Sequence, residues 1–128
     1  MPERTQRILY IEDNEEMIDL VKVILETKGY QVAGALGGAE GWRAIQELLP
    51  DLVLLDLMMP DVDGWEVYQN IRDHDATKHI PVVVITAKAQ QIDRVLAENV
   101  AGVQGYLPKP FKNIELVEIV QKIFAENE

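Results

Sequence analysis

The sequence predicts an α/β domain built on a parallel sheet. Short apolar, β-branched runs alternate along the chain with longer segments whose apolar residues recur at helical spacing. The third and fourth short runs are almost continuously apolar, which is typical of strands covered on both faces. Each strand and helix pair takes about 20–25 residues, as expected for right-handed βαβ units.

Five runs are predicted to be strands because they are short, apolar and rich in β-branched residues. Helices are predicted between them from stripes of apolar residues on one face. The predicted strands are Ile8–Ile11, Gln31–Leu36, Leu52–Leu55, Pro81–Thr86 and Val103–Leu107. The stripes are Met17/Leu20/Val21/Ile24/Leu25, Ala44/Ile45/Leu48/Leu49, Trp65/Val67/Tyr68/Ile71, Ile92/Val95/Leu96/Val100 and Leu116/Ile119/Val120/Ile123/Phe124.

Length and composition exclude several classes of protein. The 128 residues suit one domain, expected over residues 7–126 after a frayed tail of residues 1–6. A net charge of −10 argues against direct binding to nucleic acid or to an anionic membrane. The absence of cysteine excludes disulfides, thiolate zinc sites and cysteine nucleophiles. No apolar run is long enough to span a bilayer and no signal peptide is recognisable, so we expect a cytoplasmic protein.

Ionisable and hydroxyl side chains follow four of the five predicted strands. Glu12 and Asp13 follow the first, Asp56 the third, Thr86 ends the fourth, and Lys109 comes just after the fifth. The carboxyl ends of parallel strands lie at one edge of the sheet, where α/β proteins bind their ligands. We therefore expect these side chains to meet in one site.

Three carboxylates placed together repel one another unless protons or cations offset their charge. Hard oxygen ligands at a loop edge suit Mg²⁺, and a carboxylate beside Mg²⁺ and Lys109 is a plausible nucleophile toward phosphorus. Each residue also has an ordinary explanation by itself. Asp13 or Asn14 could cap the first helix, Asp56 could be a solvated acid at a strand end, Thr86 a strand former and Lys109 a surface lysine. Their joint placement at one edge favours the functional interpretation.

Four segments give the chain a resemblance to the receiver domain of two-component response regulators, the group that includes the stand-alone chemotaxis receiver. They read ILYIEDN, PDLVLLDLMMPDVDGWE, IPVVVITA and GYLPKPF, and the resemblance covers about residues 7–126. It implies a single flavodoxin-like (βα)5 domain, in which a parallel sheet of strand order 2-1-3-4-5 carries helices on both faces.

The resemblance also implies roles for the residues at the sheet edge. Asp56 is expected to accept the phosphoryl group, and Lys109 to pair with it. Asp13 is expected to bind Mg²⁺ directly and Glu12 mostly through water, while the backbone carbonyl of Met58 completes the protein ligands. The phosphoryl donor would be a histidine kinase or a histidine phosphotransfer protein.

Signalling in this family implies a conformational switch. Thr86 would bond a phosphoryl oxygen, and Tyr106 would turn inward when Thr86 moves. The rearrangement would remodel the surface of helix 4, strand 5 and helix 5 for an unknown downstream protein, with the receiver a monomer or weak dimer. The Lys109–Pro110 peptide bond is expected to be cis. No turnover of an external substrate is expected.

The fifth strand departs from the common pattern of the family. The segment before Tyr106 contains Gln104, whereas many relatives have two acids there, and the last predicted helix contains no arginine. In the winged-helix transcription factors of the family, those acids and an arginine help to form the active dimer. The departure therefore argues against that dimer here.

Three other functions compete with the phosphorylated switch. A phosphatase or mutase of the haloacid-dehalogenase type would need a second Asp two residues after the nucleophile, where this chain has Met58. A flavodoxin would need a phosphate-binding loop after the first strand, where Glu12 and Asp13 would repel phosphate. A receiver that has lost phosphorylation is the third alternative, and the retention of every residue of the expected site argues against it.

Overall fold

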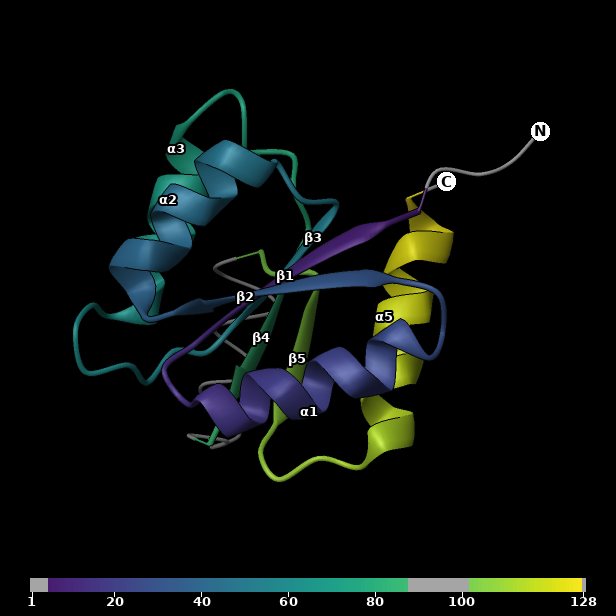
Figure 1. Cartoon of the computed structure of the whole chain (residues 1–128). Helices are drawn as coiled ribbons and strands as arrows, with labels where there is room; N and C mark the ends of the chain where they lie inside the picture. The colour runs from purple at the N-terminus through teal and green to yellow at the C-terminus, as the bar shows by residue number, and fades with distance from the viewer. Residues whose placement is uncertain (1–4, 88–101, 128) are drawn as a thin grey trace.

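Five parallel strands form the centre of the domain in the computed structural model, which describes residues 5–87 and 102–127 (Figure 1). The strand order is β2-β1-β3-β4-β5, as the resemblance implies. The strands are β1 (Arg7–Glu12), β2 (Gln31–Leu36), β3 (Leu52–Leu55), β4 (Val82–Thr86) and β5 (Gly105–Pro108). The predicted strands thus agree with the observed ones to within two residues at each end.

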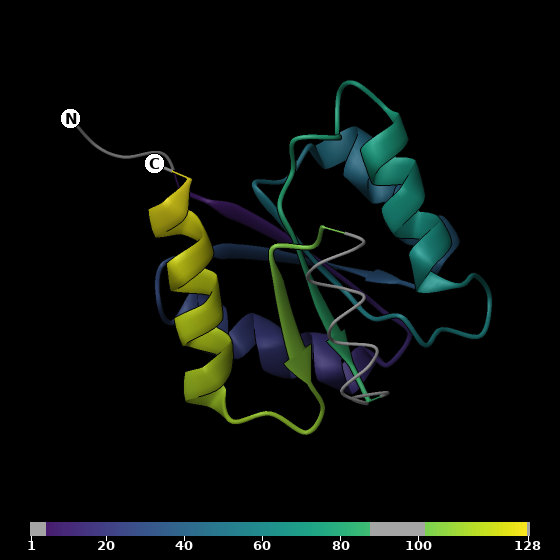
Figure 2. The same cartoon turned by 180° about the vertical axis from the view of Figure 1, so that it is seen from behind.

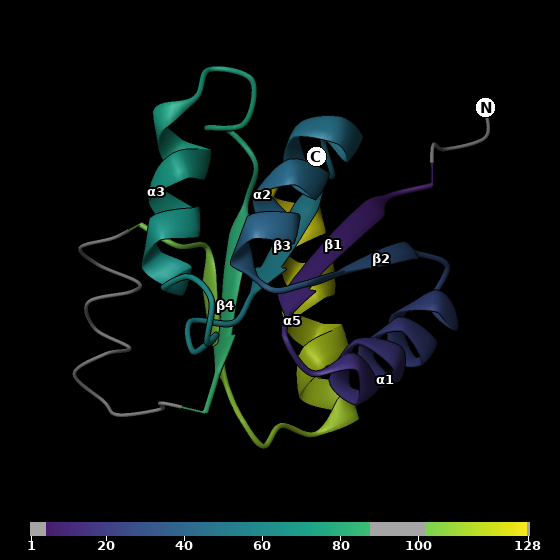
Figure 3. The same cartoon turned by 60° about the vertical axis from the view of Figure 1, so that its left-hand side comes forward.

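Four helices are described, and they cover both faces of the sheet. Figure 3 shows the sheet between the pair α1 and α5 and the pair α2 and α3, and Figure 2 shows the same arrangement from behind. Their bounds are α1 (Glu15–Glu26), α2 (Gly38–Leu48), α3 (Gly64–Asp73) and α5 (Asn113–Glu126). The fourth predicted stripe, from Ile92 to Val100, lies outside the described residues. None of the described helices is long and apolar enough to cross a membrane.

The strands are buried because helices pack on both of their faces. One side of β1 and β3 packs with α1 and α5 around Tyr10, Leu54 and Phe124. The opposite side packs with α2 and α3 around Ile11, Ile45 and Ile71. All four residues of β3 and all five of β4 are buried, which explains their nearly continuous apolar sequence.

Three apolar residues that the helical stripes include are exposed instead. Leu20 on α1 is 46% exposed, and Leu48 and Leu49 are 37% and 46% exposed. Helix α2 ends at Leu48, and Leu49 takes a left-handed conformation with φ 44°. The predicted apolar stripe therefore includes Leu49, which lies beyond the end of the helix. On α1, the predicted stripe included Leu20, but the residue that α1 buries there is Ile18.

Side-chain caps fix the starts of two helices on the edge that carries the predicted site. Asn14 caps α1 by accepting a hydrogen bond from the Met17 N–H at 3.2 Å. Asp63 caps α3 by accepting from the Trp65 N–H at 2.9 Å. The loops after β1 and β3 therefore have defined ends, and these loops hold Asp13 and Asp56.

Candidate functional site: an acidic cluster with a lysine

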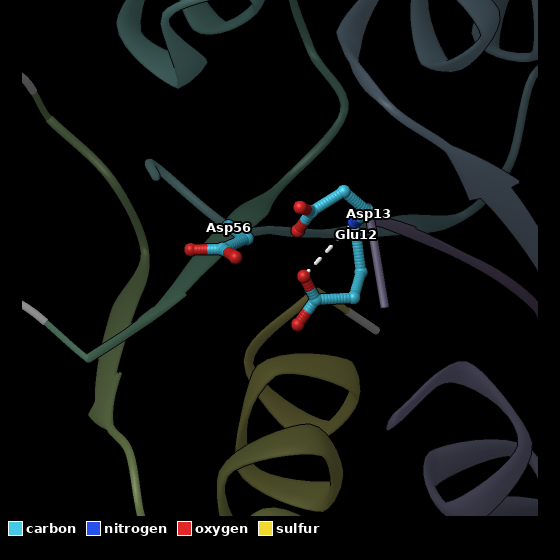
Figure 4. A group of neighbouring side chains, drawn as sticks. All are labelled: Glu12, Asp13 and Asp56. Carbon is cyan, nitrogen blue, oxygen red and sulfur yellow. Dashed lines mark hydrogen bonds between the residues drawn. The ribbon is translucent and has the colours of Figure 1, made fainter. Parts of the chain in front are cut away.

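Three carboxylates meet where β1 and β3 end. Glu12 is the last residue of β1, Asp13 follows it, and Asp56 follows β3. The two strands pair in parallel register, and the Asp56 N–H donates to the carbonyl of Ile11 at 3.0 Å. One carboxylate oxygen from each residue lies within 4.8 Å of the other two, and Figure 4 shows the three side chains beside one another where the strands end.

Lys109 brings a positive charge to this cluster from the end of β5, at the same edge of the sheet. It follows β5, and its N–H donates to the carbonyl of Thr86 at 2.9 Å, which fixes it at the end of β4. Its amine forms an ion pair with Glu12 and lies 3.4 Å from Oδ2 of Asp56. The Lys109–Pro110 peptide bond is cis.

Glu12 has a carboxyl group with almost no contact with solvent. The residue is 1% exposed. Its Oε2 accepts the Asp13 N–H at 2.9 Å, and its Oε1 accepts the Tyr10 hydroxyl at 3.1 Å in addition to the amine of Lys109. A buried carboxylate is stable only when such donors replace the lost water, so these contacts account for its burial.

Asp56 is also buried, at 3% exposed, and is held by its own loop. The Met58 N–H donates to its Oδ1 at 3.0 Å. Gly64 allows the loop to fold back on Asp56, because a Cβ at that position would lie 2.6 Å from the Asp56 carbonyl oxygen and 2.5 Å from Cα of Leu57. Asp56 is thus presented on a short loop that tolerates no side chain at Gly64.

Crowding of like charges affects the ionisation of the cluster. A hydrogen bond with the Glu12 side chain, aided by partial burial, raises the pKa of Asp13 above its usual value, and the opposing influence of Lys109 is smaller. Burial and the neighbouring Glu12 carboxylate raise the pKa of Tyr10, which keeps its hydroxyl protonated. With all three acids ionised, three negative charges face the one amine of Lys109 among the described residues, an arrangement that favours a bound cation.

The donor set fits Mg²⁺ better than a softer metal. The cluster offers carboxylate oxygens, and the described residues nearest to it contribute no histidine or thiolate. Asp13 is exposed, whereas Glu12 and Asp56 are buried, so a bound ion would keep access to water on one side. Mg²⁺ usually retains several waters and takes one or two carboxylates directly.

The two residues expected to form the switch are both buried. Thr86 ends β4 and is 0% exposed, and Tyr106 lies in β5 opposite Val84 and is 6% exposed. Tyr106 packs in the core on the α2 and α3 side of the sheet. The structure therefore places Thr86 at the edge with Lys109, and Tyr106 within the neighbouring strand.

Sequence reasoning missed Tyr10. Its hydroxyl contacts Glu12, although the residue was predicted only as part of a strand. The signal was present, because residues two apart on a strand share a face and Tyr10 precedes Glu12 by two positions.

The structure joins a doubly wound parallel sheet to an acidic cluster at the ends of β1 and β3 and a lysine after β5. Comparison with known families identifies the class of protein. The model of the response regulator receiver domain matches residues 8–121, and the chain belongs to this family as the receiver domain of a two-component response regulator.

Relatives among curated proteins are longer than this chain. It is 38% identical over 122 residues to the "DNA-binding dual master transcriptional regulator RpaA" of Synechocystis, a match that covers 95% of this chain and 50% of RpaA. It is 37% identical over 123 residues to the "DNA-binding response regulator MtrA" of Mycobacterium tuberculosis, covering 96% of this chain and 52% of MtrA. The chain thus spans about half the length of the curated relatives it matches.

Solved structures share the fold over nearly the whole chain. A putative response regulator from Chloroflexus aurantiacus superposes with a TM-score of 0.87 at 30% identity, covering 95% of this chain and 99% of that one. The receiver domain of the Francisella response regulator 1452 superposes with a TM-score of 0.88, covering 97% and 100%. At 23% identity the second comparison supports the fold alone.

Proposed function

We propose that Asp56 accepts a phosphoryl group from a histidine kinase or a histidine phosphotransfer protein. The observation that carries this proposal is the position of its carboxylate, buried within the acidic cluster and 3.4 Å from the amine of Lys109. A carboxylate oxygen of Asp56 attacks phosphorus, and the bond from phosphorus to the donor nitrogen breaks, leaving an acyl phosphate on Asp56 and a free imidazole on the donor.

Glu12, Asp13, Asp56 and the backbone carbonyl of Met58 would hold Mg²⁺. When bound, the ion offsets negative charge on the carboxylates and on the transferring phosphoryl oxygens. The Lys109 amine breaks its ion pair with Glu12 and instead stabilises the nearest phosphoryl oxygen. Thr86, whose carbonyl already accepts the Lys109 N–H, supplies a hydroxyl donor to the same group.

Transmission of the signal to a downstream protein depends on Thr86 and Tyr106. Thr86 would move toward the phosphoryl group, and Tyr106, which is already buried at 6% exposed in β5, would be held in that inward position. The change would remodel the surface formed by helix 4, β5 and α5, on which an unknown downstream protein would dock. Such a switch is a two-state element biased by a local charge.

A partner that delivers the phosphoryl group needs an apolar place to dock beside the site. A shallow groove of about 340 Å³ lies next to the lysine, lined by Met17, Leu20, Ala87, Lys109, Pro110 and Phe111. It includes Leu20, the residue of α1 that is unexpectedly exposed. Docking there would bury Leu20 and bring the donor histidine to the open side of Asp56.

The domain would catalyse only its own phosphorylation and dephosphorylation, in the cytoplasm, as a monomer or weak dimer. The charge of −10 opposes direct contact of this domain with nucleic acid. The relatives RpaA and MtrA are described as DNA-binding, and each is about twice as long as this chain. We assign any DNA contact in a longer regulator to residues outside the matched half.

Intact-mass measurement tests the proposal. The chain is incubated with Mg²⁺ and acetyl phosphate, and then with candidate kinases, and one phosphoryl mass is expected. Asp56→Asn should gain none, and wild-type protein in EDTA should gain little. Absence of any gain in wild type with every donor would instead identify a receiver that has lost phosphorylation. Steady release of phosphate from an added ester would indicate a phosphatase.

A further inference from the structure

Tyr10 places a hydroxyl in the apolar middle of β1, directed at Glu12 of the site. The residue is fully buried in β1, among the side chains that pack against α1 and α5. Its hydroxyl donates to Oε1 of Glu12 at 3.1 Å. A phenylalanine would fill the same space in the core without that bond, so packing alone does not explain the tyrosine.

The oxygen that accepts from Tyr10 is the one that also holds Lys109. Oε1 of Glu12 receives both donors, whereas Oε2 receives the Asp13 N–H at 2.9 Å. The Lys109 amine also lies close to a second carboxylate, because Oδ2 of Asp56 is 3.4 Å away. A change in the negative charge on Oε1 therefore shifts the balance between the contact of the Lys109 amine with Glu12 and its contact with Asp56.

We propose that Tyr10 is a positioning residue that weakens the hold of Glu12 on Lys109 and so makes the amine available to a phosphoryl group on Asp56. A hydrogen bond from the hydroxyl disperses charge on Oε1 and lowers its attraction for the amine. When Lys109 leaves, Glu12 remains buried but keeps the Tyr10 hydroxyl and the Asp13 N–H as donors. Without Tyr10, departure of Lys109 would leave Oε1 with no donor among those that contact it here, which is costly for a buried carboxylate.

This inference rests on the proposed function, because it assumes that Asp56 carries the phosphoryl group. The test compares Tyr10→Phe with wild type in two titrations. Isothermal titration calorimetry measures Mg²⁺ affinity alone. Titration with beryllofluoride at saturating Mg²⁺, followed by 19F NMR, measures affinity for a phosphoryl mimic on Asp56.

Tyr10→Phe should bind beryllofluoride about tenfold more weakly, the equivalent of one hydrogen bond to a charged group. Its Mg²⁺ affinity should stay the same or rise, because the Glu12 carboxylate loses a hydrogen-bond donor and keeps more of its negative charge for the ion than in wild type. Tyr30→Phe is the matched control, since Tyr30 stacks on Phe124 at the opposite edge of the sheet and should change neither affinity.

Three results would overturn the role of Tyr10. The first is equal beryllofluoride affinity in variant and wild type, and the second is tighter binding of beryllofluoride by the variant. The third is an equal loss of affinity for beryllofluoride and for Mg²⁺, which would indicate a merely structural effect. Failure of wild type itself to bind beryllofluoride with Mg²⁺ would contradict the proposed function instead. The two failures are therefore distinct.

Discussion

Asp61 caps a helix that begins 23 residues earlier in the chain. Its Oδ1 accepts the Gly38 N–H at 3.1 Å, and its Oδ2 accepts the Ala39 N–H at 3.2 Å. The residue at the cap position of α2 is Gly37, which has no side chain to offer and takes a φ of 97°. A Cβ on Gly37 would lie 2.9 Å from the Asp61 carboxylate, so the glycine makes room for the distant cap.

This cap should make stability depend on pH in the acid range. Hydrogen bonds from the Gly38 and Ala39 N–H groups lower the pKa of Asp61 in the folded state. A group with a lowered folded pKa stabilises the protein above its unfolded pKa, near 3.8, and loses that contribution as pH falls through the folded value. Asp61→Ala should cost about 1 kcal/mol of unfolding free energy at neutral pH, and the cost should shrink below pH 3.8.

Urea denaturation from pH 7 downward measures this effect. Asp75→Ala serves as the control, because its side chain is 97% exposed and forms a surface ion pair with Lys78. An Asp61→Ala cost that stays constant down to pH 2 would contradict the capping role.

Gly41 lets α2 approach β1 closely. A Cβ at Gly41 would lie 2.6 Å from Cγ2 of Ile11, which is fully buried. Alanine improves helix propensity by roughly 1 kcal/mol, but overpacking a core costs about 1–3 kcal/mol. We expect Gly41→Ala to be destabilising in guanidinium denaturation.

A double-mutant cycle isolates the contact between Gly41 and Ile11. Ile11→Ala removes the clashing methyl groups, so adding Gly41→Ala to that variant should be neutral or stabilising. Additive effects of the two substitutions would show that some other contact opposes the alanine.

Gln104 joins three segments at the end of the sheet opposite the site. Its side-chain carbonyl accepts the Val82 N–H at 2.8 Å and Nη2 of Arg72 at 3.1 Å. Gln104→Leu should therefore destabilise the protein by about 1–3 kcal/mol, because it leaves the Val82 N–H without this acceptor.

Gln104→Glu keeps both acceptor contacts and adds a charge opposite Arg72, so its stability should equal or exceed that of wild type. Thermal denaturation of both variants makes the comparison. Equal losses in the two would mean that the amide nitrogen, and not the carbonyl, matters. The result also bears on the family pattern, since relatives with acids near this position would retain the acceptor.

Mg²⁺ should stabilise the fold through the acidic cluster. A ligand at about 100 times its dissociation constant stabilises the native state by roughly 2.7 kcal/mol. Wild type should therefore melt at a higher temperature in Mg²⁺ than in EDTA at matched ionic strength. Asp13→Asn should lose most of this gain, whereas Asp75→Asn should keep it. A shift of equal size in Asp13→Asn would place the bound ion elsewhere.

The sequence predicted the sheet and the edge at which the acids meet because both depend on local patterns. A run such as Leu52–Leu55 is recognisable as a buried strand, and parallel pairing then brings Asp56 beside Glu12. The family resemblance supplied what local pattern does not contain, namely the strand order and the role of each residue.

Contacts between distant segments were not predictable in the same way. Periodicity places Leu49 on an apolar stripe but does not reveal that α2 stops at Leu48. The cap by Asp61 joins residues 22 and 23 positions apart, and the need for Gly41 depends on how closely α2 approaches Ile11. Each depends on the packing of whole elements, which a sequence pattern does not specify.

The ion pair between Lys109 and Glu12 joins residues that are 97 positions apart. During synthesis on the ribosome, the three acids emerge long before the lysine that offsets part of their charge. A nascent chain that has not yet exposed residue 109 also lacks α5 and the core residues that this helix supplies, so the acidic cluster and its lysine form together when the whole domain folds. A truncation before Lys109 should therefore lose the folded cluster as well as the lysine, because it removes α5 from the core.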